Sequence, residues 1–386
     1  MRIVHTSDWH IGKLVNGVSM LEDQRYILNQ IIDFLVTQQA ELLLVAGDLY
    51  DRSIPSTDAV SLLDEAFYRI TAEAGIPIVA VSGNHDSPQR LAFASRLYER
   101  SGLYLEGVYC KEIRRVTLRD TFGDIHFYCL PYLEPALVRA DFPERKIHSC
   151  DDALRVVMEQ NLPALDRDAR NILVTHGFYS MLRDPDAVER SDSEIQLGGS
   201  DLIDAGYLDA FDYVALGHLH RPQKVGRDSI RYSGSPLKYS VQESGCAKSI
   251  TTLDFHEKGN TSIKQFPLTP RRDLRIVAGS FEELTEPGHD KANREDYIFA
   301  ELSDDSLIPN AMDRLRAVYP NLIGLDLAGR RREYDAAAGA AAAVKNKTPQ
   351  ELFEMFYNSV KQEPITETRR EIAAGIFQDL QGGDVE

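Results

Sequence analysis

The sequence predicts an α/β protein in which a sheet of apolar strands is covered by helices on both faces. The first observation is that short apolar runs alternate with stretches whose apolar residues recur at helical spacing. The second is size, because 386 residues with 43% hydrophobic content can bury a large core in more than one domain. The predicted strands are Arg2–Thr6, Leu42–Ala46, Ile76–Val81, Ile125–Leu130, Ile172–Thr175 and Tyr213–Leu216.

The helical spacing is clearest between the first two strands. From Met20 to Gln39, apolar residues fall three and four positions apart, which predicts an amphipathic helix. From Ser233 to Pro267 the pattern changes to short strands broken by Gly and Asn, which indicates antiparallel additions. Between Phe281 and Leu327, the strand-like stretches YIFAEL and LIGLDL flank the helix-like AMDRLRAVY and predict a small α/β unit.

These changes of pattern divide the chain into four parts. We expect a main α/β domain at residues 1–270 and a small α/β domain at residues 271–334. The Ala-rich stretch at residues 335–347 is predicted to be a linker, and residues 348–386 a helical tail.

The tail carries two apolar-faced helical patterns. It begins at Thr348-Pro349-Gln350-Glu351, which has the form of a capping box with proline at the first helical position. Leu352, Phe353 and Phe356 then share one face, and Phe377 lies in the second pattern. The apolar faces of such short helices must be buried for the helices to be stable. They therefore either fold back on the chain's own core or dock on a partner protein.

Composition limits the classes of partner and compartment. The formal net charge of -17 opposes non-specific attraction to nucleic acid or to an acidic membrane surface. The four cysteines are scattered and form no Cys-x-x-Cys pair, which favours a reduced, cytoplasmic protein over a disulfide framework. The sequence shows no apolar signal core and no apolar run long enough to span a bilayer, so we expect no membrane association.

Polar residues of a particular kind follow five of the predicted strands. The carboxyl ends of neighbouring strands in an open α/β sheet lie at one edge, so these groups are expected to come together. The groups are Asp8-Trp9-His10, Gly47-Asp48-Leu49-Tyr50-Asp51, Gly83-Asn84-His85-Asp86, Thr175-His176-Gly177 and Gly217-His218-Leu219-His220.

Each group alone also has an ordinary structural explanation. Gly-Asp and Gly-Asn at a strand end are common turn residues, Asp8 could cap a helix, and a single His176 could be a satisfied core histidine. Together, however, mixed Asp, Asn and His ligands suit Mn, Fe, Zn or Mg. A carboxylate such as Asp48 can bridge two cations about 3.5–4 Å apart, which clamp a phosphate and activate a water for in-line attack. The five groups in order therefore predict a two-metal phosphoester hydrolase.

This ordered series resembles the calcineurin-like metallophosphoesterases over about the first 220 residues. More narrowly, HTSDWHIGK, AGDLYDRSIPS, SGNHDSPQRL, GHLHRPQ and YSGSPLKYS resemble the SbcD family, the nuclease subunits of bacterial SbcCD complexes. The resemblance implies a β-sandwich flanked by helices, followed by a small α/β capping domain and a C-terminal helical tail.

The resemblance also implies roles for individual residues. One metal would be held by Asp8, His10, Asp48 and His220, and the other by Asp48, Asn84, His176 and His218. His85 would face the phosphate, stabilise the transition state and protonate the leaving 3′ oxygen. Asp86 would orient His85, and Asp51 would support the ligands from behind.

The implied activity is that of a DNA nuclease. Members of the family act with manganese as double-strand exonucleases and single-strand or hairpin endonucleases, in DNA repair, recombination and replication. They work as homodimers within a heterotetramer with SbcC, a coiled-coil ATPase, whose base the tail residues Leu352, Phe353, Phe356 and Phe377 would bind. The implied dimer contact comes from helices near the active site, and its candidates here are Leu62, Leu63, Phe67, Phe93 and Leu97.

The sequence leaves the substrate and the activity open. Arg52 and Arg90 lie close to the predicted site and are candidates for contacts with the DNA backbone, although each could be a solvated surface arginine. One alternative keeps the chemistry and changes the substrate to nucleotides or phosphoproteins. A second makes the chain a scaffold with a vestigial metal site.

Overall fold

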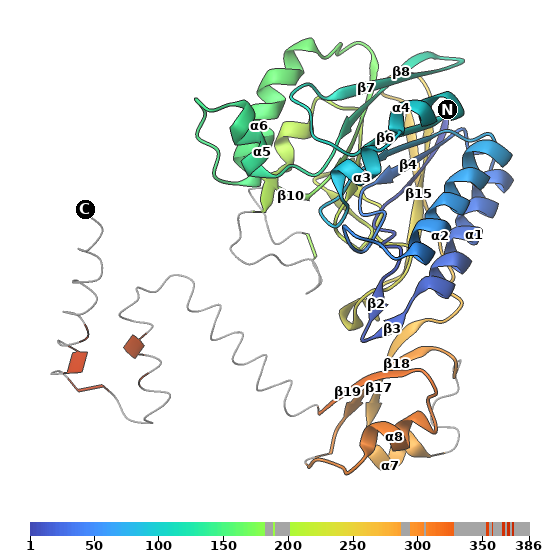
Figure 1. The fold of residues 1–386 in the computed structure, drawn as a ribbon, viewed down its shortest axis with the longest axis vertical. Coiled ribbons are helices and arrows are strands. Elements are labelled where there is room, and N and C mark those ends of the chain that lie inside the picture. Colours follow the sequence, from blue (N-terminus) through green and yellow to red (C-terminus); the bar gives the residue numbers. More distant parts are fainter. Residues whose placement is uncertain are drawn as a thin grey trace. The chain divides into compact units, whose positions relative to one another are not determined.

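The computed structural model describes residues 1–181, 188–189, 201–286, 294–304 and 306–327, together with eight residues of the tail. Within this part of the chain no helix is both long and apolar enough to cross a membrane. The main architecture is a sandwich of two six-stranded sheets with helices on its outer faces (Figure 1).

The first sheet contains the N-terminal strands. Its strand order is β16-β15-β1-β4-β5-β6, where β1, β4, β5 and β6 run parallel and β15 pairs antiparallel with both β1 and β16. The strands are β1 (Arg2–Thr6), β4 (Leu42–Ala46), β5 (Ile78–Val81), β6 (Leu103–Glu106), β15 (Ser249–Phe255) and β16 (Thr261–Pro267).

The second sheet is built from the middle of the chain. Its order is β13-β14-β12-β9-β8-β7; the four central strands run parallel, and β7 and β13 are antiparallel edges. The strands are β7 (Arg114–Asp120), β8 (Gly123–Leu130), β9 (Arg170–His176), β12 (Tyr213–Gly217), β13 (Gln223–Val225) and β14 (Arg227–Tyr232).

Side-chain alternation along the strands explains why two sheets form. In β4, Leu42, Leu44 and Ala46 point into a core shared with the second sheet, whereas Leu43 and Val45 face helices. Each sheet therefore packs one face on its partner and the other on helices, which is why its strands are apolar throughout. The sandwich implied by the family resemblance is confirmed, whereas the apolar pattern alone suggested one sheet.

Helices cover the two outer faces. On the first sheet lie α1 (Leu21–Thr37) and α2 (Thr57–Tyr68), and on the second lie α5 (Pro135–Asp141) and α6 (Cys150–Asn161) (Figure 1). The helix predicted from Met20 to Gln39 is α1, which buries Ile27, Ile31 and Leu35 as its spacing requires. Two short helices, α3 (Pro88–Ala92) and α4 (Ser95–Tyr98), follow β5.

The strand predictions differ from the structure mainly at their ends. β5 begins at Ile78 instead of Ile76, because Pro77 has no amide hydrogen to donate to the ladder. β9 begins earlier, at Arg170, and continues to His176, since polar residues extend the strand beyond its apolar run. The antiparallel additions predicted between Ser233 and Pro267 are β15 and β16.

The small α/β unit is also present. A three-stranded sheet in the order β17-β18-β19 contains β17 (Leu274–Gly279), β18 (Tyr297–Leu302) and β19 (Leu322–Leu327), with helices α7 (Phe281–Thr285) and α8 (Ala311–Arg316). The chain divides into two compact units, of which the first contains both six-stranded sheets and the second begins at Val277. The boundaries expected at residues 270, 334 and 347 stay predictions.

Short strand pairs complete the described sheets: β2 (Leu14–Val15) with β3 (Val18–Ser19), and β10 (Phe178–Ser180) with β11 (Leu202–Asp204).

Candidate metal centre

All seven predicted ligands lie where strands of the two sheets end. Asp8 and His10 follow β1, Asp48 follows β4, and Asn84 follows β5 of the first sheet. The remaining three come from the second sheet: His176 ends β9, while His218 and His220 follow β12. Neither sheet carries the whole set, so the site exists only because the sandwich aligns the carboxyl ends of strands from both sheets.

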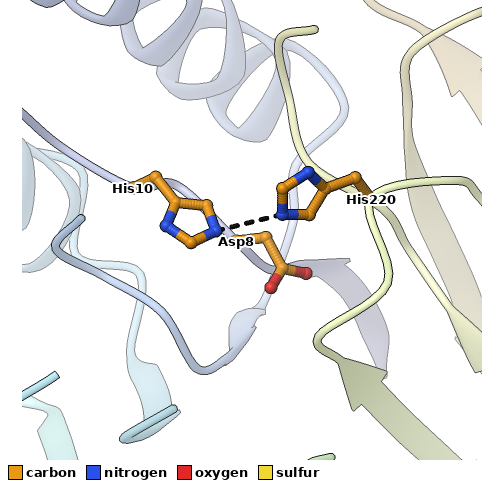
Figure 2. Close-up of side chains that lie close together, drawn as sticks. All are labelled: Asp8, His10 and His220. Carbon is orange, nitrogen blue, oxygen red and sulfur yellow. Dashed lines mark hydrogen bonds between the residues drawn. The ribbon is translucent and has the colours of Figure 1, made fainter. Parts of the chain in front are cut away.

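The first ligand group contains Asp8, His10 and His220, which point toward one another in Figure 2. The Nε2 atoms of the two histidines lie 3.1 Å apart. The Asp8 carboxylate lies close enough to both rings for all three residues to share one cation, and each of the three is buried.

The second group is centred on Asn84. Its Oδ1 atom lies 3.0 Å from His176 Nε2 and 3.1 Å from His218 Nδ1. Asp48 stands between the groups, since its Oδ2 atom is 3.4 Å from His176 Nε2 and 3.6 Å from His10 Nε2. This is the position that a carboxylate bridging two cations would occupy.

The backbone at several of these residues is held in a conformation that side-chain-bearing residues rarely adopt. Asp8, His10, Asp48 and His218 have φ values of 54°, 45°, 52° and 111°. Hydrogen bonds across the loops keep them there, including Asp8 N–H to the Gly47 carbonyl and His10 N–H to the Asp48 carbonyl. Strain concentrated at neighbouring residues of one cluster is typical of functional sites.

Two glycines of the motifs are required by close approach. A Cβ atom at Gly83 would lie 2.1 Å from Asp48 Oδ1, and one at Gly217 would lie 1.7 Å from the Ala46 carbonyl oxygen. These glycines therefore allow the loops of the two sheets to pack closely around the ligands, which gives Gly-Asn-His-Asp and Gly-His-x-His a steric reason beyond turn formation.

The ligands also perturb one another's protonation. Burial raises the pKa of Asp8 to about 6, and burial together with the charge of His176 lowers the pKa of His218 to about 3. Burial lowers the pKa of His176, but the charge and hydrogen bond of Asp48, the charge of Asp8 and the hydrogen bond to Ala46 together outweigh it, and the pKa rises to about 9. Without a cation, His176 therefore holds a proton against Asp48 at neutral pH.

His85 is fixed by contacts that its motif does not reveal. Its backbone N–H donates to Asp48 Oδ1 over 2.9 Å, and its Nδ1 lies 2.9 Å from the Asp51 carbonyl oxygen. The ring stacks edge-on against His10, with 4.7 Å between ring centroids, and the residue is partly exposed. His85 thus lies beside the first ligand group with access to solvent.

Asp86 has other partners than the one expected, whereas Asp51 lies behind a ligand as the resemblance implied. The Asp86 carboxylate accepts hydrogen bonds from the backbone amides of Leu49, Tyr50 and Gly83, so it ties the loops after β4 and β5 together. The ring of His85 contacts the Asp51 carbonyl oxygen in the role foreseen for Asp86. The Asp51 carboxylate lies behind His10, 3.6 Å from its Nδ1, and pairs with Lys13.

Supporting residues were missed by the sequence analysis. His176 Nδ1 lies 2.8 Å from the Ala46 carbonyl oxygen, so Nδ1–H donates there and Nε2 is left facing the site. His220 Nδ1 contacts Glu243 Oε1 over 3.1 Å. A backbone carbonyl has no sequence signal, and Glu243 lies outside every motif; only its closeness to the stretch YSGSPLKYS could have drawn attention to it.

Comparison with known proteins agrees with this geometry. A family model described as calcineurin-like phosphoesterase matches residues 1–222. The SbcD component of the nuclease SbcCD from Staphylococcus epidermidis is 32% identical over 372 residues, which are 96% of this chain and 96% of that protein. The chain belongs to the SbcD family of calcineurin-like phosphoesterases.

A second family model and two solved structures are also similar to this chain. A second family model, described as the type 5 capsule protein repressor C-terminal domain, matches residues 270–361. Among solved structures, GAP50, the anchor in the inner membrane complex of Plasmodium, is 13% identical, with a TM-score of 0.37 over 84% of this chain and 96% of that one. A dimetal phosphatase from Danio rerio is 11% identical, with a TM-score of 0.38 over 69% of this chain and 95% of that one. Scores this low carry no argument about function.

The residues of this SbcD-type site fit a divalent cation. Burial lowers the pKa of His10 well below its usual value, so this imidazole is neutral, as a metal ligand must be. Its Nε2 faces that of His220 with the carboxylates of Asp8 and Asp48 close by, and these are hard and borderline donors without a thiolate. A divalent cation would satisfy both facing nitrogens and the buried negative charge.

The structure describes only some of the residues predicted to contact DNA or a partner protein. Arg52 and Arg90 are both exposed; Arg52 lies 3.7 Å from the Asp51 carboxylate, and Arg90 lies on α3. In the tail of this SbcD-type chain, Phe353 is 37% exposed. Leu352, Phe356, Phe377 and the linker at residues 335–347 lie outside the described residues.

Proposed function

We propose that this chain is the nuclease subunit of an SbcCD-type complex, a manganese-dependent double-strand exonuclease and single-strand or hairpin endonuclease that serves DNA repair, recombination and replication. The observation that carries the proposal is the position of Asp48 between two groups of buried metal-type ligands. The nuclease activity is proposed from the name of the Staphylococcus epidermidis relative, with which the chain shares nearly its whole length, and the metal and the kinds of cleavage are proposed from the family resemblance.

Two divalent cations would be held by the seven ligands. Asp8, His10 and His220 would hold one, and Asn84, His176 and His218 the other, while Asp48 would contact both. When bound, such a pair clamps a phosphate and lowers the pKa of a water between its members. Manganese is the proposed metal because of the family resemblance; the Asp, Asn and His donors also suit iron and magnesium.

The chain's own residues would position the substrate and move the proton. Because Nδ1 of His85 contacts the Asp51 carbonyl oxygen, Nε2 is the ring nitrogen left to donate a proton to the leaving 3′ oxygen. Asn84 and His85 are the partly exposed members of an otherwise buried site, so a phosphodiester would approach from their side. Arg52 and Arg90 would contact the DNA backbone on that side.

The acidic composition is compatible with this role if a partner supplies much of the DNA-binding surface. A net charge of -17 repels a polyanion, so local contacts at the metal centre alone would hold DNA weakly. We propose an SbcC-type ATPase as that partner, bound through Leu352, Phe353, Phe356 and Phe377 of the tail.

The proposal is tested with the purified chain and an end-labelled DNA duplex. With Mn²⁺ the chain is expected to shorten the duplex, and a chelator should abolish cleavage. A small phosphodiester run in parallel separates the substrate from the chemistry. Cleavage of the small ester without cleavage of DNA, even after addition of the SbcC-type ATPase, would favour a phosphodiesterase or phosphatase acting on nucleotides or phosphoproteins. Absence of both activities and of Mn²⁺ binding would contradict a metallohydrolase.

A homodimer within a heterotetramer is the assembly that we propose. Leu62, Leu63 and Phe67 are buried in the core of the chain, but Phe93 is 77% exposed and Leu97 is 72% exposed. Phe93 directly follows α3, and Leu97 lies in α4. Phe93 also lines an open groove of about 920 Å³ between α2 and α3. Large exposed apolar side chains beside a groove are typical of an interaction surface.

Charging this surface should separate the protomers. We expect a Phe93→Asp, Leu97→Asp double variant to sediment as a monomer under conditions in which the wild type sediments as a dimer, because two carboxylates would have to be desolvated in the contact. Phe122→Asp is the matched control, since Phe122 is also exposed but lies between β7 and β8. A dimer that survives the double substitution would rule out this surface.

A further inference from the structure

A buried ion pair stands directly behind His220. Glu243, at the end of a short 3-10 helix at Val241–Glu243, is fully buried, and Lys248 is almost as inaccessible. Both belong to the segment between β14 and β15, beyond the residues 1–222 that the phosphoesterase family model matches. Nothing in the five loop motifs accounts for two buried charges at this place.

The side-chain contacts of the pair are centred on His220. Glu243 Oε1 accepts from His220 Nδ1 over 3.1 Å and from the Ser240 hydroxyl over 2.9 Å. Glu243 Oε2 accepts from Lys248 Nζ over 2.5 Å. Lys248 Nζ also donates to the His220 carbonyl oxygen over 2.8 Å and to the Ser235 hydroxyl over 2.9 Å. The pair therefore holds His220 by its ring and by its backbone.

A purely stabilising role explains the pair poorly. Removing two charges from water costs free energy that their attraction often fails to recover, so a buried ion pair is weak evidence for stability. Its geometry does suit the control of an imidazole: Glu243 accepts Nδ1–H, which leaves Nε2 to face Asp8 and His10. Lys248 balances the charge of Glu243, so this support adds no net negative charge behind the ligands.

We propose that Glu243 and Lys248 are positioning residues that fix the tautomer and orientation of His220 for cation binding by the Asp8, His10 and His220 group. The inference rests on the proposed metal centre. The second group is supported differently, because His176 donates to the backbone carbonyl of Ala46. Loss of the pair should therefore weaken one of two cations selectively.

The first test needs no metal. In metal-free protein labelled with ¹⁵N-histidine, long-range ¹H–¹⁵N spectra should show His220 with the proton on Nδ1. In a Glu243→Leu, Lys248→Met variant, which removes both charges together and leaves neither buried alone, His220 should show a mixture of tautomers. An unchanged His220 tautomer in that variant would overturn the inference, whatever the outcome for the metal centre.

The second test is a Mn²⁺ titration by calorimetry. The wild type should bind two ions, and the double variant should bind one of them 10- to 100-fold more weakly while retaining the other. The matched control is Asp120→Leu, Arg170→Met, which removes a buried ion pair at the opposite end of β9 from His176 and should change neither affinity. Thermal melts would show that both variants fold.

The outcomes separate the two proposals. Two ions bound by the double variant with wild-type affinity would overturn the positioning role and leave the metal centre intact. Equal weakening of both ions would also contradict it, because the effect would not be confined to His220. A wild type that binds no ion would overturn the proposed metal centre itself, and the tautomer spectra would then show only how His220 is held.

Discussion

Replacing His85 with alanine should lower Mn²⁺-dependent DNA cleavage by about 10²- to 10⁴-fold while leaving both cations bound. That range is the usual contribution of a positioned proton donor. Metal binding should survive because His85 contacts Asp48 through its backbone N–H, which alanine keeps. The ring contacts His10 and the Asp51 carbonyl oxygen, and one of its nitrogens lies within 4.8 Å of the Asp51 carboxylate.

The measurement pairs cleavage of an end-labelled duplex with a Mn²⁺ titration of the same preparation. His148→Ala is a suitable control, since His148 is exposed and lies before α6, away from the ligands. A cleavage rate within a few fold of the wild-type rate would contradict the catalytic role proposed for His85. Loss of a cation in the variant would instead make His85 a structural support of the site.

Replacing Asp48 with asparagine should weaken both cations together, by more than about 100-fold each. Loss of a residue that only hydrogen-bonds to a metal ligand typically lowers metal affinity 10- to 100-fold. Asp48 is itself a proposed ligand and lies between the two groups, so its loss should cost more at both cations. Asparagine keeps the shape of the side chain and an oxygen to accept the His85 N–H, so the loop should stay in place. Only the charge and one ligand oxygen are lost.

Calorimetry with Mn²⁺ checks this result against Asp124→Asn. Asp124 is an exposed carboxylate near the start of β8 that pairs with Arg119, so its variant should bind both cations. If Asp48→Asn lost only one cation, Asp48 would belong to a single group. The contrast with the Glu243 and Lys248 variant, in which one cation should weaken, separates a bridging residue from a support for one ligand.

These experiments also bear on the acidic character of the chain. A nuclease with a net charge of -17 cannot rely on the long-range attraction that most DNA-binding proteins use. Buried ligands that hold divalent cations would provide positive charge where the phosphate must sit. DNA affinity that rises strongly on addition of the SbcC-type ATPase would agree with this division of work.

Much of this protein was readable from its sequence. Apolar runs identified the central strands, and the change from apolar to polar residues at their ends located Asp8, His10, Asp48, Asn84, His85, His176, His218 and His220. Such side chains are a strong signal because buried strand ends seldom carry several Asp, Asn and His residues without a use for them. The order of the motifs was enough to indicate the family.

Tertiary structure decided how those residues are shared and supported. The apolar pattern could not tell that β9 and β12 belong to a second sheet, because strands buried on both faces look alike whether they form one sheet or two. It could not find the Ala46 and Asp51 carbonyls that orient His176 and His85, since every residue has a carbonyl. Nor could it distinguish Glu243 and Lys248 from surface charges, because burial and pairing arise only when the segment after β14 folds against His220.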